Sequence, residues 1–170
     1  MMMCERTSEG VAEGSIVATK PQSNLTPWLA LWTYSRMDDD AYDKVLAAQG
    51  LPWAVRKLLQ AFTAQREFVI DDANRFFFKS KMLTGSWNGL HPDCPTNFSV
   101  LGYSIETLVT WEDEGRLLVS TMKTTASDGF ITSGWDSTTR ITHALQEDGE
   151  LLITTIAPEG QYCMWMKRVT

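Results

Sequence analysis

Residues 26–64 read TPWLALWTYSRMDDDAYDKVLAAQGLPWAVRKLLQAFTA, and this stretch decides the fold that the sequence predicts. Its opening run, residues 28–34, is aromatic and apolar, which is typical of a buried β-strand. Three aspartates at 38–40 then supply an N-cap and favourable first-turn charge for a short helix, which Gly50 ends. Pro52 begins a second helix with apolar residues at helical spacing. We therefore expect one strand followed by a helix-turn-helix.

The rest of the chain has the pattern of short strands separated by turns. Nine further strands are expected, at residues 66–70, 75–83, 98–101, 103–111, 116–123, 130–135, 138–146, 150–157 and 161–168. Residues suited to tight turns separate them at 71–74, 112–115, 127–129, 147–149 and 158–160. The exception is residues 84–97, where we expect a long loop that is either functional, as a second gate, or loosely ordered. The fold class is therefore mainly β, a ten-stranded antiparallel up-and-down β-barrel capped by a helix-turn-helix lid.

Length, charge and cysteine content limit the organisation and the partners of the chain. Its 170 residues suit one domain, so we expect a disordered N-terminal tail at 1–25 and a barrel domain at 26–170. A net charge of −6 argues against a nucleic-acid partner. Charged residues near the N-terminus and the lack of a long apolar run favour the cytoplasm. The three cysteines have neither disulfide nor metal-ligand spacing, so we expect reduced thiols, no metal and no cofactor.

Both ends of the predicted barrel resemble a known family. Trp32, residues 39–44, Gly50 and Arg56 resemble the opening signature of intracellular fatty-acid-binding proteins and their retinoid-binding relatives. Similar resemblance to the family's C-terminal third is carried by Trp135-Asp136, Thr138, Thr139, Ile141, Asp148-Gly149 and Cys163. The resemblance implies a calycin-type barrel that encloses a small hydrophobic ligand, such as a fatty acid or a retinoid. We expect an intracellular carrier that acts as a monomer.

The resemblance also indicates where a ligand headgroup would be held. The family commonly binds a ligand carboxylate with an arginine on the eighth strand and an arginine-x-tyrosine pair on the tenth. His143 stands at the first position here, and Trp165 and Lys167 stand at the other two. Strand alternation places Thr139, Ile141, His143 and Leu145 inside and Arg140 in solvent. Without an arginine beside a neutral His143, we expect a neutral or weakly polar headgroup, with a carboxylate as the alternative if Lys167 or protonated His143 compensates.

The candidate ligand-binding residues combine these positions with the adaptable apolar lining of the barrel and lid. They are His143, Ile141, Thr139, Trp135, Trp165, Lys167, Met122, Leu59 and Phe62. For two residues of this set an alternative to ligand contact stays open. The alternative for His143 is a satisfied interior histidine. The alternative for Lys167 is a position facing solvent, because the last strand is apolar on both faces and its register is ambiguous.

The two helices are expected to be the portal, since they are easier to displace than hydrogen-bonded strands. Their inner faces are expected to be Tyr42, Val45, Leu46, Val55, Leu58, Leu59 and Phe62. Arg56 and Lys57 either face anionic lipid during a transient membrane contact or form a solvated helix face.

Two other functions remain compatible with the same barrel. No catalytic residue pair or phosphate-binding loop stands out, but coelenterazine-using luciferases look similar to this barrel, and a buried histidine or lysine could polarise an oxidisable ligand. A cofactor-independent enzyme, such as a luciferase or an isomerase, is therefore the main alternative. A barrel with a filled interior, serving only as an interaction module, is the other.

Overall fold

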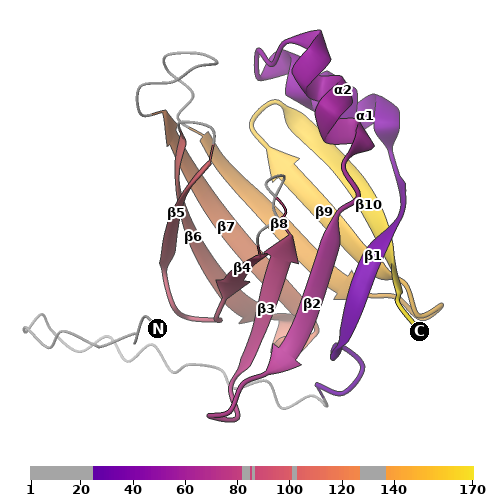
Figure 1. The fold of residues 1–170 in the computed structure, drawn as a ribbon, viewed down its shortest axis with the longest axis vertical. Coiled ribbons are helices and arrows are strands. Elements are labelled where there is room, and N and C mark those ends of the chain that lie inside the picture. The colour runs from indigo at the N-terminus through magenta and orange to yellow at the C-terminus, as the bar shows by residue number, and fades with distance from the viewer. Residues whose placement is uncertain (1–24, 82–84, 86, 101–102, 127–136) are drawn as a thin grey trace, which may run out of the picture.

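The described residues form ten strands and two α-helices (Figure 1). The computed structural model describes residues 25–81, 85, 87–100, 103–126 and 137–170. The tail expected at 1–25 lies, apart from Leu25, outside them, as do the strand expected at 130–135 and the turn at 127–129. The first strand and the helices are β1 (Ala30–Met37), α1 (Asp39–Ala48) and α2 (Trp53–Ala61). The remaining strands are β2 (Gln65–Ile70), β3 (Phe76–Lys81), β4 (Trp87–Leu90), β5 (Thr96–Val100), β6 (Tyr103–Glu112), β7 (Leu117–Ala126), β8 (Ser137–Leu145), β9 (Leu151–Ala157) and β10 (Gly160–Arg168).

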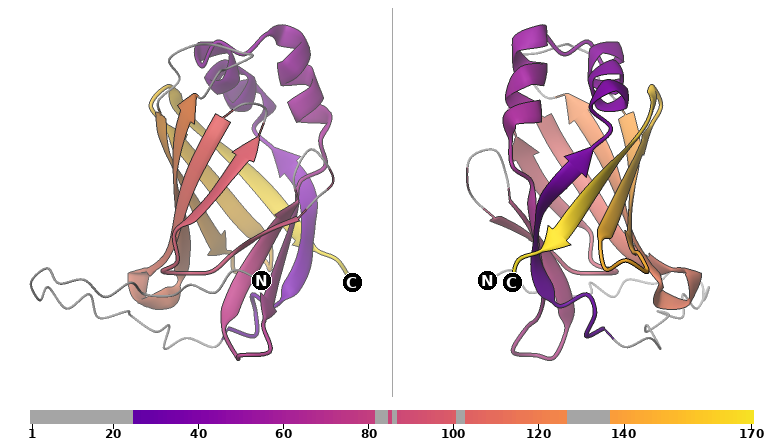
Figure 2. Two further views of the ribbon diagram at one scale, coloured as in Figure 1. Left: turned by 60° about the vertical axis from the view of Figure 1, so that its left-hand side comes forward. Right: turned by 90° about the vertical axis from the view of Figure 1, so that its right-hand side faces the viewer.

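All ten strands belong to one antiparallel sheet that curls into a nearly closed barrel. Their order is β4-β3-β2-β1-β10-β9-β8-β7-β6-β5, so β1 and β10 close the sheet and β4 and β5 are its edges. The helix pair lies across one end of the barrel in both turned views (Figure 2). We call α1 and α2 the lid, and the opposite end of the barrel the base. The predicted lidded up-and-down barrel is confirmed.

The expected long loop at residues 84–97 is wrong, because it contains β4 and the start of β5. Within β4, Gly89 pairs with Lys79 of β3 and lies against the ring of Phe77. A four-residue strand with a central glycine has little local signal, and pairing with a longer neighbour provides its order. The described residues therefore contain the predicted number of strands, ten, but one of them, β4, is a strand that the sequence did not predict.

Helix α1 is fixed firmly to β10. The Asp38 side chain caps its first turn, as the aspartate run predicts. The ring of Tyr42 meets that of Tyr162 edge to face at 4.8 Å between centroids. Gly160 at the start of β10 has φ +147°, and a Cβ there would lie 3.2 Å from Val45 Cγ2. The close approach of α1 to β10 therefore depends on a glycine at this turn.

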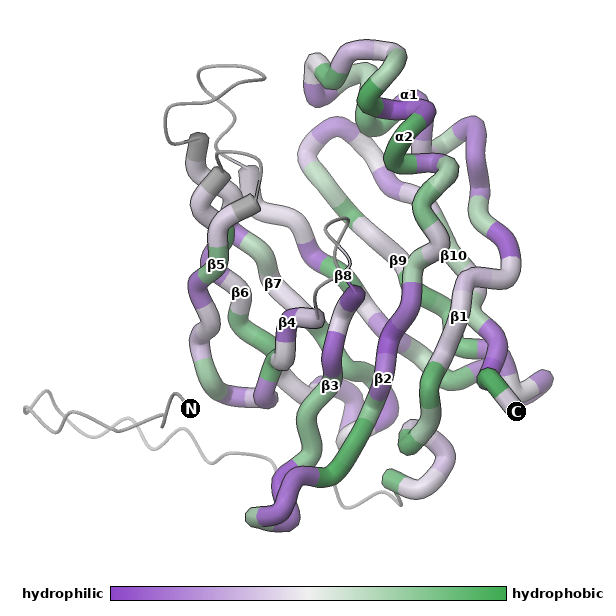
Figure 3. Tube along the Cα trace, viewed as in Figure 1, coloured by the Kyte–Doolittle hydropathy of each residue, from purple (hydrophilic) through white to green (hydrophobic). Residues whose placement is uncertain are grey.

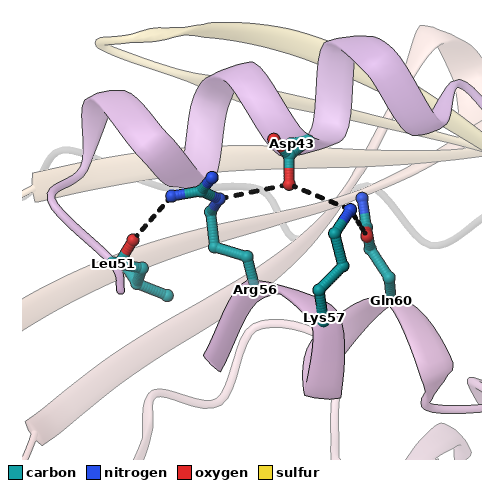
Figure 4. Close-up of polar contacts among 5 residues, drawn as sticks. All are labelled: Asp43, Leu51, Arg56, Lys57 and Gln60. Carbon is teal, nitrogen blue, oxygen red and sulfur yellow. Dashed lines mark hydrogen bonds and ion pairs between the residues drawn. The ribbon is translucent and has the colours of Figure 1, made fainter. Parts of the chain in front are cut away.

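Helix α2 is tied to α1 by a polar network rather than by a core of its own (Figure 4). Arg56 Nε donates to Asp43 Oδ1 at 3.1 Å, and Arg56 Nη1 donates to the carbonyl of Leu51 at 3.0 Å. Lys57 Nζ lies 3.7 Å from the same Asp43 oxygen and donates to Gln60 Oε1 at 2.6 Å. Arg56 is partly buried between the helices and paired with Asp43, so it is less accessible than Lys57, and its contact with anionic lipid stays a prediction.

Five of the seven residues predicted for the inner face of the lid lie there, one is exposed, and the inward position of the half-buried Val55 stays a prediction. Val45 and Leu46 of α1 are buried, and Leu59 and Phe62 of the second helix line the interior. Leu58, expected to face inward, is 64% exposed. Leu58 precedes Leu59 directly, and neighbouring positions on a helix are rotated by about 100° from each other. With Leu59 facing the barrel, Leu58 therefore turns away from it.

The base of the barrel is filled by apolar side chains. Its core is Trp28, Trp32, Phe68, Phe76, Phe78, Leu90, Val109, Leu118, Leu151, Ile153 and Met166. Phe68 lies at its centre, with ring centroids 5.5 Å from Trp28, 5.9 Å from Phe76 and 5.5 Å from Phe78. Contacts of this kind provide most of the stability of a small domain. The opposite end of the barrel, beneath the lid, is hollow, so the barrel is not filled throughout.

Candidate functional site

A cavity of about 250 Å³ lies beneath the lid. We call it the lid cavity. Both helices and the lid-side ends of four strands line it, through Tyr34, Met37, Tyr42, Leu59, Phe62, Ala64, Arg66, Ser80, Lys81, Tyr162 and Met164. The expected ligand-binding residues Leu59 and Phe62 are part of this lining. The cavity combines apolar and polar side chains, and its strand residues lie on the lid side of the aromatic core.

Arg66 is one of two charged residues in this described lining, with Lys81. It is the second residue of β2, and the register pairs it with Trp32 of β1 and Ser80 of β3. Alternation puts it on the same face as the buried Phe68, so its side chain points inward. It is surrounded by protein yet keeps some accessible surface, because part of that surface lies in the cavity. Burial lowers the pKa of Arg66 to about 10, which leaves it charged at neutral pH.

Two tyrosines face the same cavity as neutral hydroxyl groups. Burial raises the pKa of Tyr42, and the neighbouring Tyr162 raises it further. Burial also raises the pKa of Tyr162, although a hydrogen bond with Thr155 and the charge of Arg66 act in the opposite direction. Both phenols are therefore protonated near neutral pH, and each can donate or accept a hydrogen bond.

His143 lies deeper in the barrel, on β8. It is 1% exposed, and its ring lies 5.4 Å from that of Phe78 and 6.2 Å from that of Phe68. Nδ1 lies 3.1 Å from the carbonyl oxygen of Leu118. A carbonyl only accepts, so Nδ1 carries the proton and Nε2 presents a lone pair. Burial, followed by the charge of Arg66, lowers the pKa of His143 to about 3, so the ring is neutral at physiological pH.

Several buried polar atoms around His143 lack partners. Nε2 of His143 and the hydroxyls of Thr107, Ser120 and Ser137 accept or donate no hydrogen bond among the described residues. All four lie on β6, β7 and β8, across the barrel from β2. Buried polar groups are normally satisfied, so this wall has capacity for further hydrogen bonds. His143 is thus an interior histidine with a partner for one ring nitrogen only, and its contact with a ligand stays a prediction.

The face assignment of β8 is confirmed. Ile141 and Leu145 pack against the core, His143 is buried, and Arg140 lies outside in an ion pair with Glu112 at 2.6 Å. Thr139 is half-buried and pairs with Met122 of β7, which is half-buried too. Neither these residues nor His143 belong to the lining of the lid cavity. Their contact with a ligand stays a prediction, and Trp135 lies outside the described residues.

Trp165 and Lys167 do not reach the interior. Met166 between them is fully buried, so alternation turns both toward the outside of β10. The Arg36 guanidinium lies 4.6 Å from the Trp165 ring centroid, and Lys167 is exposed. Their expected place around the ligand is wrong, because the family positions were counted from Cys163 on a strand that is apolar on both faces.

The sequence-based search missed Arg66, and the idea that no arginine approaches His143 is wrong. The signal was present in residues 65–70, read QREFVI, where Arg66 alternates with Phe68 and Ile70. A strand whose Phe68 faces the core must place Arg66 on that same face. The sequence analysis assigned no face to this strand, and the pairing of β2 with β1 and β3 shows which face is inside.

Among the described residues, no group of three or more His, Cys, Asp or Glu side chains is placed to hold a metal ion. No helix in the described ranges has the length and apolar character needed to cross a membrane.

Solved structures show which proteins share this barrel. No protein-family model and no curated protein matches the chain by sequence. Lipid binding protein 8 of Caenorhabditis elegans matches with a TM-score of 0.66 at 14% identity, over 87% of this chain and 99% of that one. A Schistosoma mansoni fatty acid binding protein in complex with arachidonic acid matches with 0.66 at 16%, over 87% and 100%. Human cRBP IV matches with 0.59 at 14%, over 83% and 97%. The fold implied by the sequence resemblance is therefore confirmed.

Proposed function

We propose that this protein is a carrier that encloses a small hydrophobic ligand in the lid cavity. The supporting observation is a hollow between a lid with an apolar inner face and a base filled with aromatic side chains. The same barrel occurs in proteins named for binding lipid and fatty acid. We further propose that the carrier acts in the cytoplasm as a monomer.

The lid cavity suits a compact ligand. Its volume of about 250 Å³ lies just below the range of roughly 300–1,000 Å³ typical of small-molecule sites. Met37, Leu59, Phe62 and Met164 supply apolar contacts, and methionine adapts to irregular ligand shapes. Each buried methylene of a ligand contributes about 0.8 kcal/mol, so even a short chain supplies useful affinity. A medium-length chain or a small ring system therefore fits better than a long acyl chain.

Displacement of Nile red, a neutral fluorescent probe, tests the carrier proposal. Ala64 lines the cavity, so Ala64→Phe should fill it and reduce probe affinity at least about tenfold. Ala54→Phe adds the same side chain to an exposed position of α2 and is the matched control. Equal probe affinity in the two variants, or no saturable binding by the wild type, would contradict the proposal.

We place the portal beneath α2. Helix α1 is fixed to β10, whereas every residue of the second helix keeps some exposure. Trp53 is 66% and Leu58 64% exposed, and Lys57 is exposed beside them. Tryptophan, leucine and lysine suit a membrane interface, so these residues, more than Arg56, carry the proposed transient contact. Probe transfer to anionic vesicles should slow in the double variant Trp53→Ser, Leu58→Ser, and an unchanged rate contradicts this contact.

The enzymatic alternative depends on His143. A general base works best with a pKa near the operating pH, and burial holds the pKa of His143 near 3. This weighs against acid–base catalysis by His143 but leaves hydrogen bonding to a ligand through Nε2. Turnover of an oxidisable ligand that His143→Ala abolishes, without loss of folding, would favour the enzyme over the carrier.

A further inference from the structure

The lid cavity has a charge opposite to that of the whole chain. The chain carries a net charge of −6, yet the described lining contains Arg66 and Lys81 and neither Asp nor Glu. Figure 3 shows how this arises: β2 and β3 are hydrophilic toward the lid and hydrophobic toward the base. A positive cavity in an acidic protein selects for the charge of what enters it.

Arg66 has donors to spare. Its Nη1 donates to the backbone carbonyl of Gln65 at 3.1 Å, and its other guanidinium N–H groups have no acceptor among the described residues. No carboxylate in the described part of the chain pairs with it, although seven other ion pairs occur there. A partly buried cation without an ionic partner is unfavourable, so a bound anion would relieve this state.

The surroundings of Arg66 contain no internal anion that could take this place. Glu67, next to it in sequence, points to the opposite face of β2 and pairs with Lys79 at 3.0 Å. On the lid, Asp43 is engaged by Arg56. The other described elements around the cavity present neutral groups and one cation, Lys81 of β3, which donates to Gln65 Oε1 at 2.9 Å. The neutral groups are Tyr42 of α1, Leu59 of α2, Phe62 after it, Tyr34 and Met37 of β1, Ala64 before β2, Ser80 of β3, and Tyr162 and Met164 of β10.

We infer that Arg66 forms an anion-binding subsite beneath the lid, which holds the carboxylate of an amphipathic ligand against its guanidinium group and the Tyr162 hydroxyl. This inference rests on the proposed carrier function. The ligand's apolar part lies along Leu59, Phe62 and Met164, because Phe68 and Phe78 fill the space below Arg66. The charged end therefore stays near the portal instead of entering the base. The neutral headgroup favoured from sequence is replaced by an anionic one.

Competition between decanoic acid and its methyl ester for Nile red tests the subsite. The wild type should prefer the acid, and Arg66→Gln should weaken acid binding about 10- to 100-fold while ester binding changes little. Arg66→Lys, which keeps the charge, should retain part of the preference. Lys44→Gln removes one exposed positive charge from the lid and should retain all of it.

The outcomes separate the inference from the function on which it rests. Equal affinities for acid and ester in the wild type, or an acid preference that survives Arg66→Gln, overturn the subsite and leave the carrier intact. Failure of both ligands and of Nile red to bind the wild type overturns the carrier, and the subsite with it. Nile red binding by Arg66→Gln itself shows that this variant keeps a folded cavity.

Discussion

The two ends of the barrel interior differ although the same strands run through both. On β2, Arg66 near the lid is followed by Phe68 toward the base, and on β3, Phe78 toward the base is followed by Ser80 near the lid. One rung of pairing thus separates a polar cavity from an aromatic core. The apolar core lies at the base and the proposed binding site at the lid end, so substitutions at the two ends should affect different measurements.

Removal of one phenylalanine from each end gives the largest expected contrast. Phe68→Ala leaves a cavity among Trp28, Phe76 and Phe78 and should lower the free energy of unfolding by about 3–5 kcal/mol. Phe62→Ala enlarges an existing hollow and should cost only on the order of 1 kcal/mol while weakening Nile red binding. Urea unfolding and probe titration measure the two effects. Equal destabilisation by the two variants would remove the distinction between the ends.

Acid sensitivity should come from the boundary between the ends, at His143. The folded-state pKa of about 3 lies below the unfolded value of ~6.5, so the unfolded chain binds the proton first and stability falls as pH drops below 6.5. The loss attributable to this residue approaches about 1.4 kcal/mol per pH unit well below pH 6.5, and it amounts to on the order of 2 kcal/mol between pH 6.5 and 4.5. Comparison of urea unfolding for the wild type and His143→Gln measures it.

The pH range of that comparison matters, because carboxylates contribute at lower pH. Hydrogen bonds to arginine lower the pKa of Asp43 and Glu112, so their stabilising effect is lost as pH falls from the ordinary carboxyl range, about 4, through those lowered values. Working above pH 4.5 isolates the histidine. Parallel stability curves for the wild type and His143→Gln over this range would show that His143 is not the acid-sensitive group.

The sequence predicted the features that have a local cause. The aspartate cap of α1 is a local signal, and so is the alternation that placed His143 inside and Arg140 outside. Both survive because helix capping and strand alternation need only neighbouring residues.

The features that depend on pairing partners were missed. Strand β4 owes its order to β3, and Arg66 owes its burial to β1 and β3 on either side. Trp165 and Lys167 went wrong because Tyr162, Met164 and Met166 alternate with residues that are equally apolar, so the pattern cannot tell inside from outside. Sequence reasoning therefore found the barrel and part of the interior, but not the charge that distinguishes the lid end.

Replacing the unpaired cation should stabilise the empty protein. Arg66→Met keeps a long side chain, removes the buried charge and should raise the free energy of unfolding by about 1–2 kcal/mol. Arg140→Met is the matched control, because it removes the same group from a partly exposed ion pair with Glu112 and should lower stability by less than about 1 kcal/mol. Thermal unfolding without ligand compares them. Clear destabilisation by Arg66→Met would mean that Arg66 already has a stabilising partner.

The smallest expected effect is a flat pH profile for carboxylate binding. A carboxylate paired with protonated His143 would bind more tightly as pH falls from 8 to 6, but the pKa of His143 near 3 keeps the ring neutral over that range. Arg66 stays charged there, with a pKa of about 10, while burial keeps Tyr42 and Tyr162 neutral. Decanoate affinity should therefore change less than about twofold between pH 6 and 8, where both the acid and Arg66 are ionised. Fluorescence titration at pH 6, 7 and 8 measures this profile, with methyl decanoate as the control that should not respond. A steady gain in decanoate affinity from pH 8 to 6 that disappears in His143→Leu would move the headgroup from the lid end to the β8 wall.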